Sequence, residues 1–196
     1  MKNLRAYIVS AIMGALGFIL MMLEISVPLM PSFIKLDFSE LPALITSFAF
    51  GPLFGVLVCL IKNLIHLFIS QTAGIGELSN FLLGASFAFV AGFVYKKNKT
   101  RNGALLASVT GSLIMGLFSI LVNYFLVYPL YAKLLMPYEV ILGLYKAILP
   151  NINSIFTALL VFNAPFTLVK GLIDAAICFL IYKKLSPILK KSKNNA

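Results

Sequence analysis

The sequence contains little acidic charge, few cysteines and no tryptophan. Asp and Glu together number 6, histidine occurs once in 196 residues, and both cysteines, Cys59 and Cys178, lie in apolar segments. Two such thiols form neither a zinc motif nor a disulfide framework, so we expect small buried core residues. The chain also lacks a G-x-x-x-x-G-K-[ST] loop, an H-E-x-x-H motif and a G-x-S-x-G motif. The sequence therefore contains no motif that supports an enzymatic function, and no catalytic residue, cofactor or metal ligand is predicted.

Apolar residues dominate what is present. The chain is 61% hydrophobic and 11% charged, with a mean hydropathy of +1.00, which is far from the composition of a soluble domain. The net charge of +10 comes from basic residues, 11 of the 16 lying in three short clusters at the ends of apolar runs. The clusters are Lys2 and Arg5; Lys96, Lys97, Lys99 and Arg101; and Lys183, Lys184, Lys190, Lys191 and Lys193. Such placement favours contact with anionic membrane lipid over nucleic acid and predicts a multi-pass protein of the cell membrane.

The basic clusters also constrain the topology. Short loops rich in Lys and Arg stay in the cytoplasm, so an even number of crossings should separate each pair of clusters. Residues 41–69 could form one long helix or two helices joined at Gly51-Pro52. One helix would place the second cluster outside, whereas two place it inside, so we predict two. The result is an all-α integral membrane protein, one compact domain over residues 1–196 with six transmembrane helices and both termini cytoplasmic. The predicted spans are 7–27, 41–50, 53–69, 81–95, 104–128 and 165–182, and no fold is predicted for the outer stretch 132–162.

Polar residues within or beside the spans gather in one layer of this topology. Ionisable groups at membrane depth are costly, which makes them functional candidates. The layer lies in the outer half of the bundle, which favours a pocket open to the exterior over a through-channel. It comprises Asp37, Glu40, Lys62, Asn63, His66, Glu77, Asn80, Asn123, Tyr124, Tyr128, Thr167 and Lys170.

Lys170 is the sharpest candidate in this layer. Asp174 follows one helical turn later, so the two could form a structural ion pair. Alternatively, Lys170 donates to a ligand carbonyl while Asp174 keeps it charged, and both interpretations can hold together. Asn123 suits an amide-like or imide-like ligand edge, or bonds between helices. Tyr124 is either part of an interfacial aromatic belt or stacks on a flat ligand, and His66 is expected to have a packing role.

Two further segments suggest movement and docking. Prolines at positions 28, 31 and 42 bound the first outer loop, residues 28–40, in which apolar and polar residues alternate; we predict that it is a lid over the ligand. In the first span, Ala11 and Ala15 form a small-xxx-small strip that allows close helix approach. The strip could pack internally or against another subunit.

Several sequence segments resemble those of a known protein family. With KLDFSELPALI, FGPLFG, KNLIH, ELSNFLLGASF, NYFLVYPLY and APFTLVKG, it resembles the riboflavin-specific substrate-binding (S) component of energy-coupling factor (ECF) vitamin transporters. The resemblance implies six helices, a vitamin pocket roofed by the first outer loop, and partnership with a transmembrane coupling subunit and two ATPase subunits. Ala11 to Ala15 would be the docking strip. The implied ligand contacts are Leu36, Asp37, Phe38, Ala43, Asn80, Asn123, Thr167 and Lys170, where relatives carry Asn at the Thr167 position.

Competing functions remain at this point. The leading hypothesis is high-affinity riboflavin capture at the outer face, with transport powered by separate ATPases. Riboflavin carries no phosphate, so one paired lysine suffices, whereas FMN would need more positive charge. Alternatives are an S component for another vitamin or flavin analogue, a membrane scaffold, or an ion-coupled secondary transporter. The last needs carboxylates near the bilayer midplane, and only Asp174 approaches that description.

Overall fold

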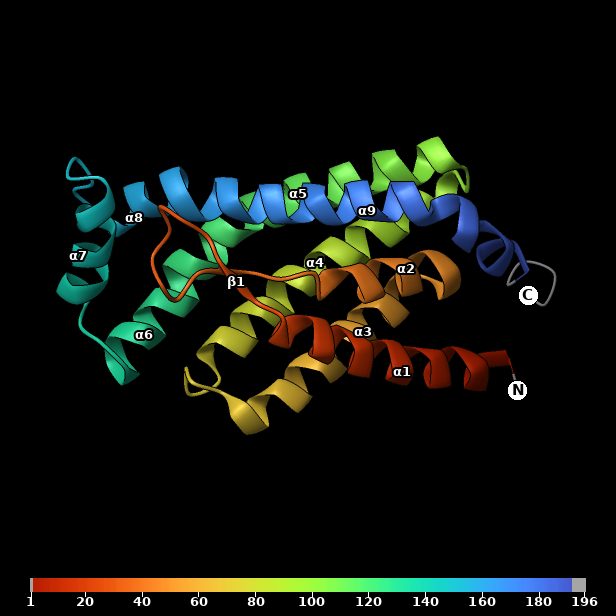
Figure 1. The fold of residues 1–196 in the computed structure, drawn as a ribbon, viewed down its shortest axis with the longest axis horizontal. Helices are drawn as coiled ribbons and strands as arrows, with labels where there is room; N and C mark the ends of the chain where they lie inside the picture. The colour runs from red at the N-terminus through yellow and green to blue at the C-terminus, as the bar shows by residue number, and fades with distance from the viewer. Residues whose placement is uncertain (1, 192–196) are drawn as a thin grey trace.

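The computed structural model describes the backbone of residues 2–191 and the side chains of residues 4–182, so Lys193 and the side chains of the third basic cluster lie outside the described residues. The chain forms a helical bundle with one short antiparallel hairpin (Figure 1). In chain order the elements are α1 (Lys2–Met22), β1 (Ile25–Ser26), β2 (Lys35–Leu36), α2 (Glu40–Phe50), α3 (Pro52–His66), the 3-10 turn η1 (Leu67–Ile69), α4 (Ile75–Lys97), α5 (Arg101–Val122), the π-helical turn η2 (Asn123–Val127), α6 (Tyr128–Leu134), α7 (Tyr138–Ile148), α8 (Ile155–Ala158), the π-helical turn η3 (Leu159–Asn163) and α9 (Ala164–Lys191).

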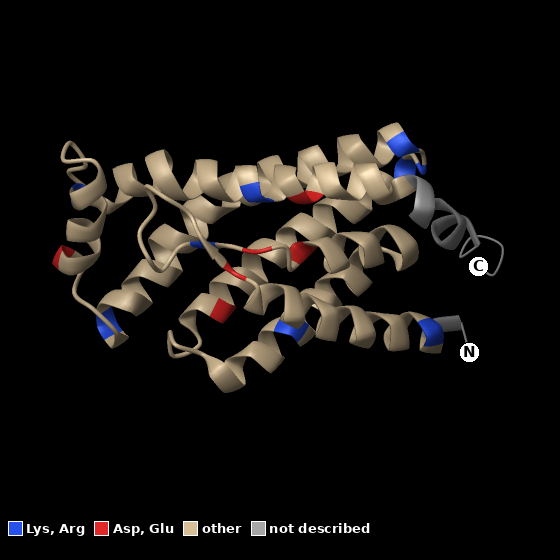
Figure 2. Ribbon diagram, viewed as in Figure 1, with Lys and Arg blue, Asp and Glu red and all other residues tan. Residues whose placement is uncertain are grey.

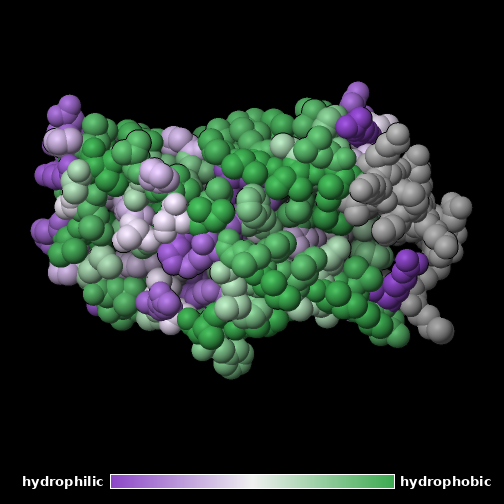
Figure 3. Space-filling view, in the orientation of Figure 1, coloured by the Kyte–Doolittle hydropathy of each residue, from purple (hydrophilic) through white to green (hydrophobic). Residues whose placement is uncertain are grey.

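The surface is that of a protein in a membrane. Within the described residues, five helical stretches are long and apolar enough to cross a bilayer, and α2 is a shorter apolar helix. The five are Leu4–Met22, Pro52–Ile69, Ile75–Lys97, Arg101–Leu134 and Ile155–Tyr182. On the face drawn in Figure 3, apolar residues cover most of the middle of the molecule and hydrophilic residues gather toward its ends. Figure 2 shows the start of α1 and the α4–α5 connection, both with basic residues, at the same end.

The short helix α2 occupies the centre of the bundle. It contacts α1, α3, α4 and α9, and seven of its eleven residues are buried. Gly51 ends it with a φ of 113°, a conformation that glycine adopts readily. Pro52 then begins α3, where its missing N–H costs nothing. The chain therefore forms two helices over residues 41–69, as the distribution of basic clusters predicted.

Glycine also sets how closely α3 approaches α2. A Cβ atom on Gly55 would lie 2.6 Å from Ser47 Cβ and 2.8 Å from the Ala43 carbonyl oxygen, closer than real Cβ contacts allow. Ala43 is fully buried at this contact. The absence of a side chain at Gly55 thus allows the central helix to sit deep among its neighbours.

Two helices are longer than the predicted spans. The fifth runs without a break from Arg101 to Leu134 instead of 104–128, and the last begins at Ile155 instead of 165. Pro129 was expected to follow the end of the fifth span, and Pro165 was expected to begin the last one. Each instead follows a π-helical turn, η2 or η3, in which the i→i−4 bonding pattern is already interrupted. The stretch 132–162, for which no fold was predicted, contains α7 and α8.

The first outer loop folds over the bundle as a hairpin. Ile25 pairs with Leu36 and Ser26 with Lys35 in an antiparallel ladder, and Lys35 also pairs with Glu24. From β2 the chain descends directly into α2, so the loop connects the surface of the bundle to its centre (Figure 1).

Candidate ligand-binding site

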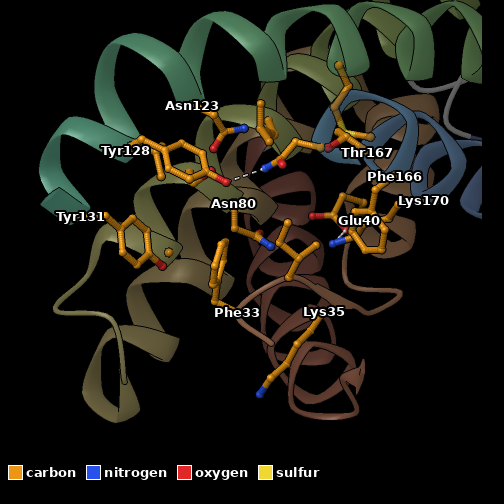
Figure 4. Close-up of a pocket in the computed structure, with 17 residues that line it drawn as sticks. Phe33, Lys35, Glu40, Asn80, Asn123, Tyr128, Tyr131, Phe166, Thr167 and Lys170 are labelled. Atoms are coloured by element: carbon orange, nitrogen blue, oxygen red, sulfur yellow. Dashed lines mark hydrogen bonds and ion pairs between the residues drawn. The ribbon is translucent and has the colours of Figure 1, made fainter. Parts of the chain in front are cut away.

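A small cavity lies beneath this loop, with a volume of about 170 Å³. Its walls come from the loop, α4, α5 with η2 and α6, and η3 with α9, so segments distant in sequence converge on it (Figure 4). The lining residues are Phe33, Ile34, Lys35, Glu40, Gly76, Ser79, Asn80, Leu83, Met115, Asn123, Val127, Tyr128, Tyr131, Asn163, Phe166, Thr167 and Lys170. The cavity thus combines aromatic and apolar walls with a few amides and one buried ammonium group.

Lys170 is held by carboxylates from the loop and α2. Its Nζ lies 2.9 Å from Asp37 Oδ2 and 2.9 Å from Glu40 Oε2. The other oxygen of Glu40 accepts from Lys62 Nζ at 2.8 Å, and Lys62 also donates to Ser39 Oγ. Two ammonium groups and two carboxylates thus form a buried charged quartet, Asp37, Glu40, Lys62 and Lys170, which ties the loop to α2, α3 and α9.

The predicted pairing of Lys170 with Asp174 is wrong. Asp174 is fully buried, and neither of its carboxyl oxygens has a hydrogen-bond partner among the described residues. The reason lies in helix geometry. Side chains lean toward the N-terminus of their helix, so Lys170 reaches away from Asp174 and toward the loop. A lysine placed before an acid at i,i+4 is also the less favourable order for a helical pair.

Asp37 remains ionised in this setting. Burial by itself would raise the pKa of the Asp37 carboxyl, but the Lys170 and Lys62 ammonium groups outweigh burial and lower the pKa to about 2. The Ser39 backbone N–H donates to Asp37 Oδ1 at 2.8 Å, which stabilises the charged form further. The loop is therefore held by a permanent charge.

Asparagine side chains give the cavity a defined hydrogen-bonding pattern. Asn123 donates to the Ser119 carbonyl at 2.8 Å, which leaves its side-chain oxygen as an acceptor toward the cavity. Asn80 accepts from Asn63 at 3.3 Å through its oxygen, which leaves its N–H groups as donors. Lys170 uses two of its three donors on carboxylates. The site therefore offers several donors and a smaller number of acceptors.

Aromatic residues form the wall of the cavity on the α6 side. Phe33 of the loop lies edge-on to Tyr128 and Tyr145, at centroid distances of 6.4 and 6.1 Å. It also lies 6.1 Å from Tyr131. A loop aromatic inserted among three tyrosines buries apolar surface and fixes the tip of the loop.

Four of the predicted ligand contacts line the cavity: Asn80, Asn123, Thr167 and Lys170. The other five, Leu36, Asp37, Phe38, Ala43 and Tyr124, do not line it. Asp37 is paired with Lys170, Ala43 is buried against α3, and Tyr124 is 41% exposed and packs edge-on against Phe125 and Phe156. Leu36 and Phe38 are partly buried beside the cavity without lining it, because the alternation in the loop turns Asp37 and Ser39 inward.

Several lining residues were missed as ligand contacts by the sequence analysis. Phe33 and Asn163 were not candidates, whereas Glu40 lay within the implied contact range Leu36 to Ala43 and Tyr128 was one of the tyrosines that could belong to an aromatic belt or stack on a flat ligand. Asn163 had a usable signal, because it precedes Thr167 by four residues and Lys170 by seven, which places all three on one helical face. Pro165 obscured that signal by suggesting that the helix began after Asn163.

The interpretation of His66 as a packing residue agrees with its contacts. Its Nδ1 lies 2.7 Å from Glu77 Oε1, and Ser70 and Thr72 donate to the other oxygen of Glu77. This cluster connects the end of α3 to the start of α4 beside the cavity and contributes no lining atom.

The strip on α1 faces away from the bundle. Ala11 and Ala15 are exposed, whereas Ser10, Gly14 and Gly17 on the other face of the helix are buried. Within the part of the chain that the structure describes, Ala11 and Ala15 therefore do not pack into the bundle.

A bundle of long apolar helices that encloses a cavity with converging amides and a buried lysine defines an integral membrane protein that binds a small molecule. The family model for the substrate-specific component of ECF transporters matches residues 5–182. The chain belongs to this family, which makes it a transport component and not an enzyme.

Similar proteins agree over nearly the whole chain. A riboflavin transporter RibU of Staphylococcus aureus (strain TCH60) is 28% identical, over 97% of this chain and 95% of the relative. A riboflavin transporter FmnP of Bacillus subtilis (strain 168) is 28% identical, over 98% and 97%. A RibU of Streptococcus thermophilus is 34% identical, over 97% and 87%. A solved structure described as the S component of a bacterial ECF transporter superposes with a TM-score of 0.75, at 28% identity, covering 97% of this chain and 99% of the other.

Proposed function

We propose that this protein captures riboflavin at the outer face of the cell membrane and delivers it as the substrate-specific subunit of an ATP-driven ECF transporter. The observation that carries this proposal is the cavity under the first outer loop, where three asparagines and the third donor of Lys170 meet an aromatic wall. Three relatives with near-complete coverage are riboflavin transporters, which supports the choice of vitamin.

The hydrogen-bonding pattern suits the polar edge of a flavin. The pyrimidine part of the isoalloxazine ring presents two carbonyl oxygens, ring-nitrogen acceptors and one N–H donor. Lys170, Asn80 and Asn163 are donors to such acceptors, and the Asn123 side-chain oxygen accepts from the single N–H. The flat ring needs aromatic and apolar walls, which Phe33, Phe166 and the tyrosines supply.

The loop of residues 28–40 acts as a lid in this proposal. The cavity of about 170 Å³ is smaller than the roughly 300–1,000 Å³ typical of small-molecule pockets. Riboflavin entry therefore requires the lid to lift, with Phe33 leaving its tyrosines while the charged quartet anchors the base of the loop. The ligand contacts proposed for the bound state include Leu36 and Phe38, which lie beside the cavity and can reach it when the lid closes on the larger ligand.

The proposed topology has six crossings. Five long helices and the central α2 supply them, with both termini and the basic α4–α5 connection in the cytoplasm. The lid and the cavity then face the exterior, opposite the basic end of the bundle.

Docking to the transport machinery is assigned to the exposed strip on α1. Ala11 and Ala15 allow a helix of a transmembrane coupling subunit to approach closely. In this proposal that subunit associates with two ATPase subunits, and their ATP hydrolysis drives release of riboflavin inward.

The test is a riboflavin titration of the purified protein in detergent, followed by quenching of flavin fluorescence. We expect saturable quenching at one site. FMN should compete poorly, because Lys170, the cavity ammonium group besides Lys35, is already paired with two carboxylates. A protein that purifies colourless and does not quench riboflavin fluorescence would refute the proposal.

A further inference from the structure

Three buried polar side chains on the α6 side of the cavity form a closed hydrogen-bonded ring. Tyr145 Oη donates to Asn163 Oδ1 at 2.6 Å, Asn163 Nδ2 donates to Tyr128 Oη at 3.0 Å, and the Tyr128 and Tyr145 hydroxyls bond to each other. The residues come from three elements, α6, α7 and η3, and each is less than 9% exposed. Figure 4 shows the bond from Tyr128 to the amide nitrogen.

The donors and acceptors of the Asn163 amide give the ring one direction. O–H···O bonds are shorter than N–H···O bonds, with typical lengths near 2.7 and 2.9–3.0 Å. The contact of 2.6 Å from Tyr145 to the amide oxygen of Asn163 and the contact of 3.0 Å from its nitrogen to Tyr128 agree with these lengths. The Tyr145 hydroxyl donates its hydrogen bond to Asn163, so the Tyr128 hydroxyl must donate to Tyr145. Each of the three groups then donates once and accepts once.

This arrangement has a consequence for the cavity. The oxygen of Asn163 points away to Tyr145, and one of its two N–H groups is used on Tyr128. The second N–H has no acceptor among the described side chains, and Asn163 lines the cavity. At this position the site therefore presents a donor and no acceptor. A flipped amide would present its oxygen instead and reject the same ligand atom.

We propose that Tyr145 is a specificity-determining positioning residue, which never touches the ligand but holds the Asn163 amide so that an N–H faces a ligand acceptor. Tyr145 is fully buried on α7 and does not line the cavity, so it acts only through its neighbours. The ligand atom opposite Asn163 is a carbonyl oxygen or an unprotonated ring nitrogen. This inference rests on the proposed function for the identity of the ligand, riboflavin.

The test is a double-mutant cycle with riboflavin titrations of the detergent-solubilised full chain. Tyr145→Phe removes the hydroxyl but keeps the ring against Phe33, and we expect riboflavin affinity to fall roughly 3- to 10-fold, as for one neutral hydrogen bond. Asn163→Ala should lose a similar factor. The double variant should lose no more than Asn163→Ala alone, because Tyr145 acts through that amide. Tyr138→Phe is the matched control, since Tyr138 lies on the same helix, exposed and outside the ring. Unchanged affinity in Tyr145→Phe, or losses that simply add in the double variant, would overturn the proposal.

A second measurement covers the case in which Tyr145→Phe does not fold. In wild-type protein labelled with ¹⁵N-asparagine, the Asn163 side-chain signals are identified by their loss in Asn163→Ala. We expect one amide proton to be shifted and protected from exchange before riboflavin is added, and the other to shift on addition. Two amide protons that are both unshifted and rapidly exchanging in the free protein would refute the positioning role. Absence of riboflavin quenching by the wild type would refute the proposed function, and the signals of the free protein would still decide the role of Tyr145.

Discussion

Replacement of Lys170 by methionine separates its role in binding from its role in the charged quartet. Methionine keeps most of the volume of the lysine stem and removes the ammonium group. In the native protein that group has three donors, two of them spent on Asp37 and Glu40 at 2.9 Å each. The third is available to a flavin carbonyl. Loss of one charge-assisted hydrogen bond, about 1.5–3 kcal/mol, predicts a fall in riboflavin affinity of roughly 10- to 150-fold.

The same substitution should also destabilise the protein. Removal of one partner from a buried ion pair costs about 3–5 kcal/mol. The lower end is expected here, because Asp37 keeps the Ser39 N–H and Glu40 keeps Lys62. Adding Asp37→Asn removes the unpaired charge, so Lys170→Met with Asp37→Asn should regain most of the lost stability without regaining affinity.

The assay combines fluorescence titration with thermal unfolding in detergent. Lys133→Met, at an exposed position on α6, serves as the control for loss of a lysine. If Lys170→Met bound riboflavin with wild-type affinity, Lys170 would have a structural role and no role in ligand binding. A double variant as unstable as the single one would show that Asp37 is not the carboxylate that matters.

Three further predictions concern docking, packing and pH. Ala11→Trp and Ala15→Trp should preserve riboflavin binding and abolish uptake in cells that carry the complete transporter, since both positions are exposed; equal loss of binding in the purified variants would contradict a docking role. In thermal unfolding, Gly55→Ala should destabilise the protein by about 1–3 kcal/mol through overpacking against Ser47 and the Ala43 carbonyl. The control Gly143→Ala has nothing within 4 Å of the added Cβ atom, so it should be neutral or stabilising by up to about 1 kcal/mol. The pKa of Asp37 is lowered to about 2 from its ordinary value of 3.8, so the contribution of this carboxylate to stability is complete above the ordinary value and is lost only as the pH falls through about 2. Protease protection of residues 28–40 should therefore stay constant from about pH 8 to about pH 5. A midpoint of protection within that window would show that another group controls the lid.

Sequence reasoning was most successful where a local pattern has one physical solution. Gly51-Pro52 interrupts an apolar run with the two residues that end and begin helices most readily, and the chain does break there. Asn80, Asn123, Thr167 and Lys170 were found because polar groups within apolar spans are rare and costly. These residues do converge on one cavity.

The partners of these residues were not accessible to the same reasoning. Spacing along one helix suggested Asp174 for Lys170, but its partners are Glu40 and Asp37, the latter 133 positions away. That contact depends on how the loop descends into α2, which periodicity does not encode. Tyr145 was missed for a similar reason, since it lies in the outer stretch for which no fold was predicted and reaches the site through Asn163 and Tyr128.

The central position of α2 explains how capture and docking can be carried out by one small bundle without interfering. The exposed strip lies on α1, which contacts α2 and α3, whereas Lys170 and Thr167 lie on α9, which contacts α5 and α2. The central helix α2 touches both α1 and α9, and its first residue, Glu40, belongs to the charged quartet beneath the cavity. A change at the lid can therefore reach α1 through a single buried helix whose Ser47 and Ala43 are packed tightly against Gly55. Because a close-packed core has low compressibility and transmits strain, a shift of α2 would reach both α1 and α9, whereas bulk added at the exposed position of Ala11 leaves these buried contacts in place.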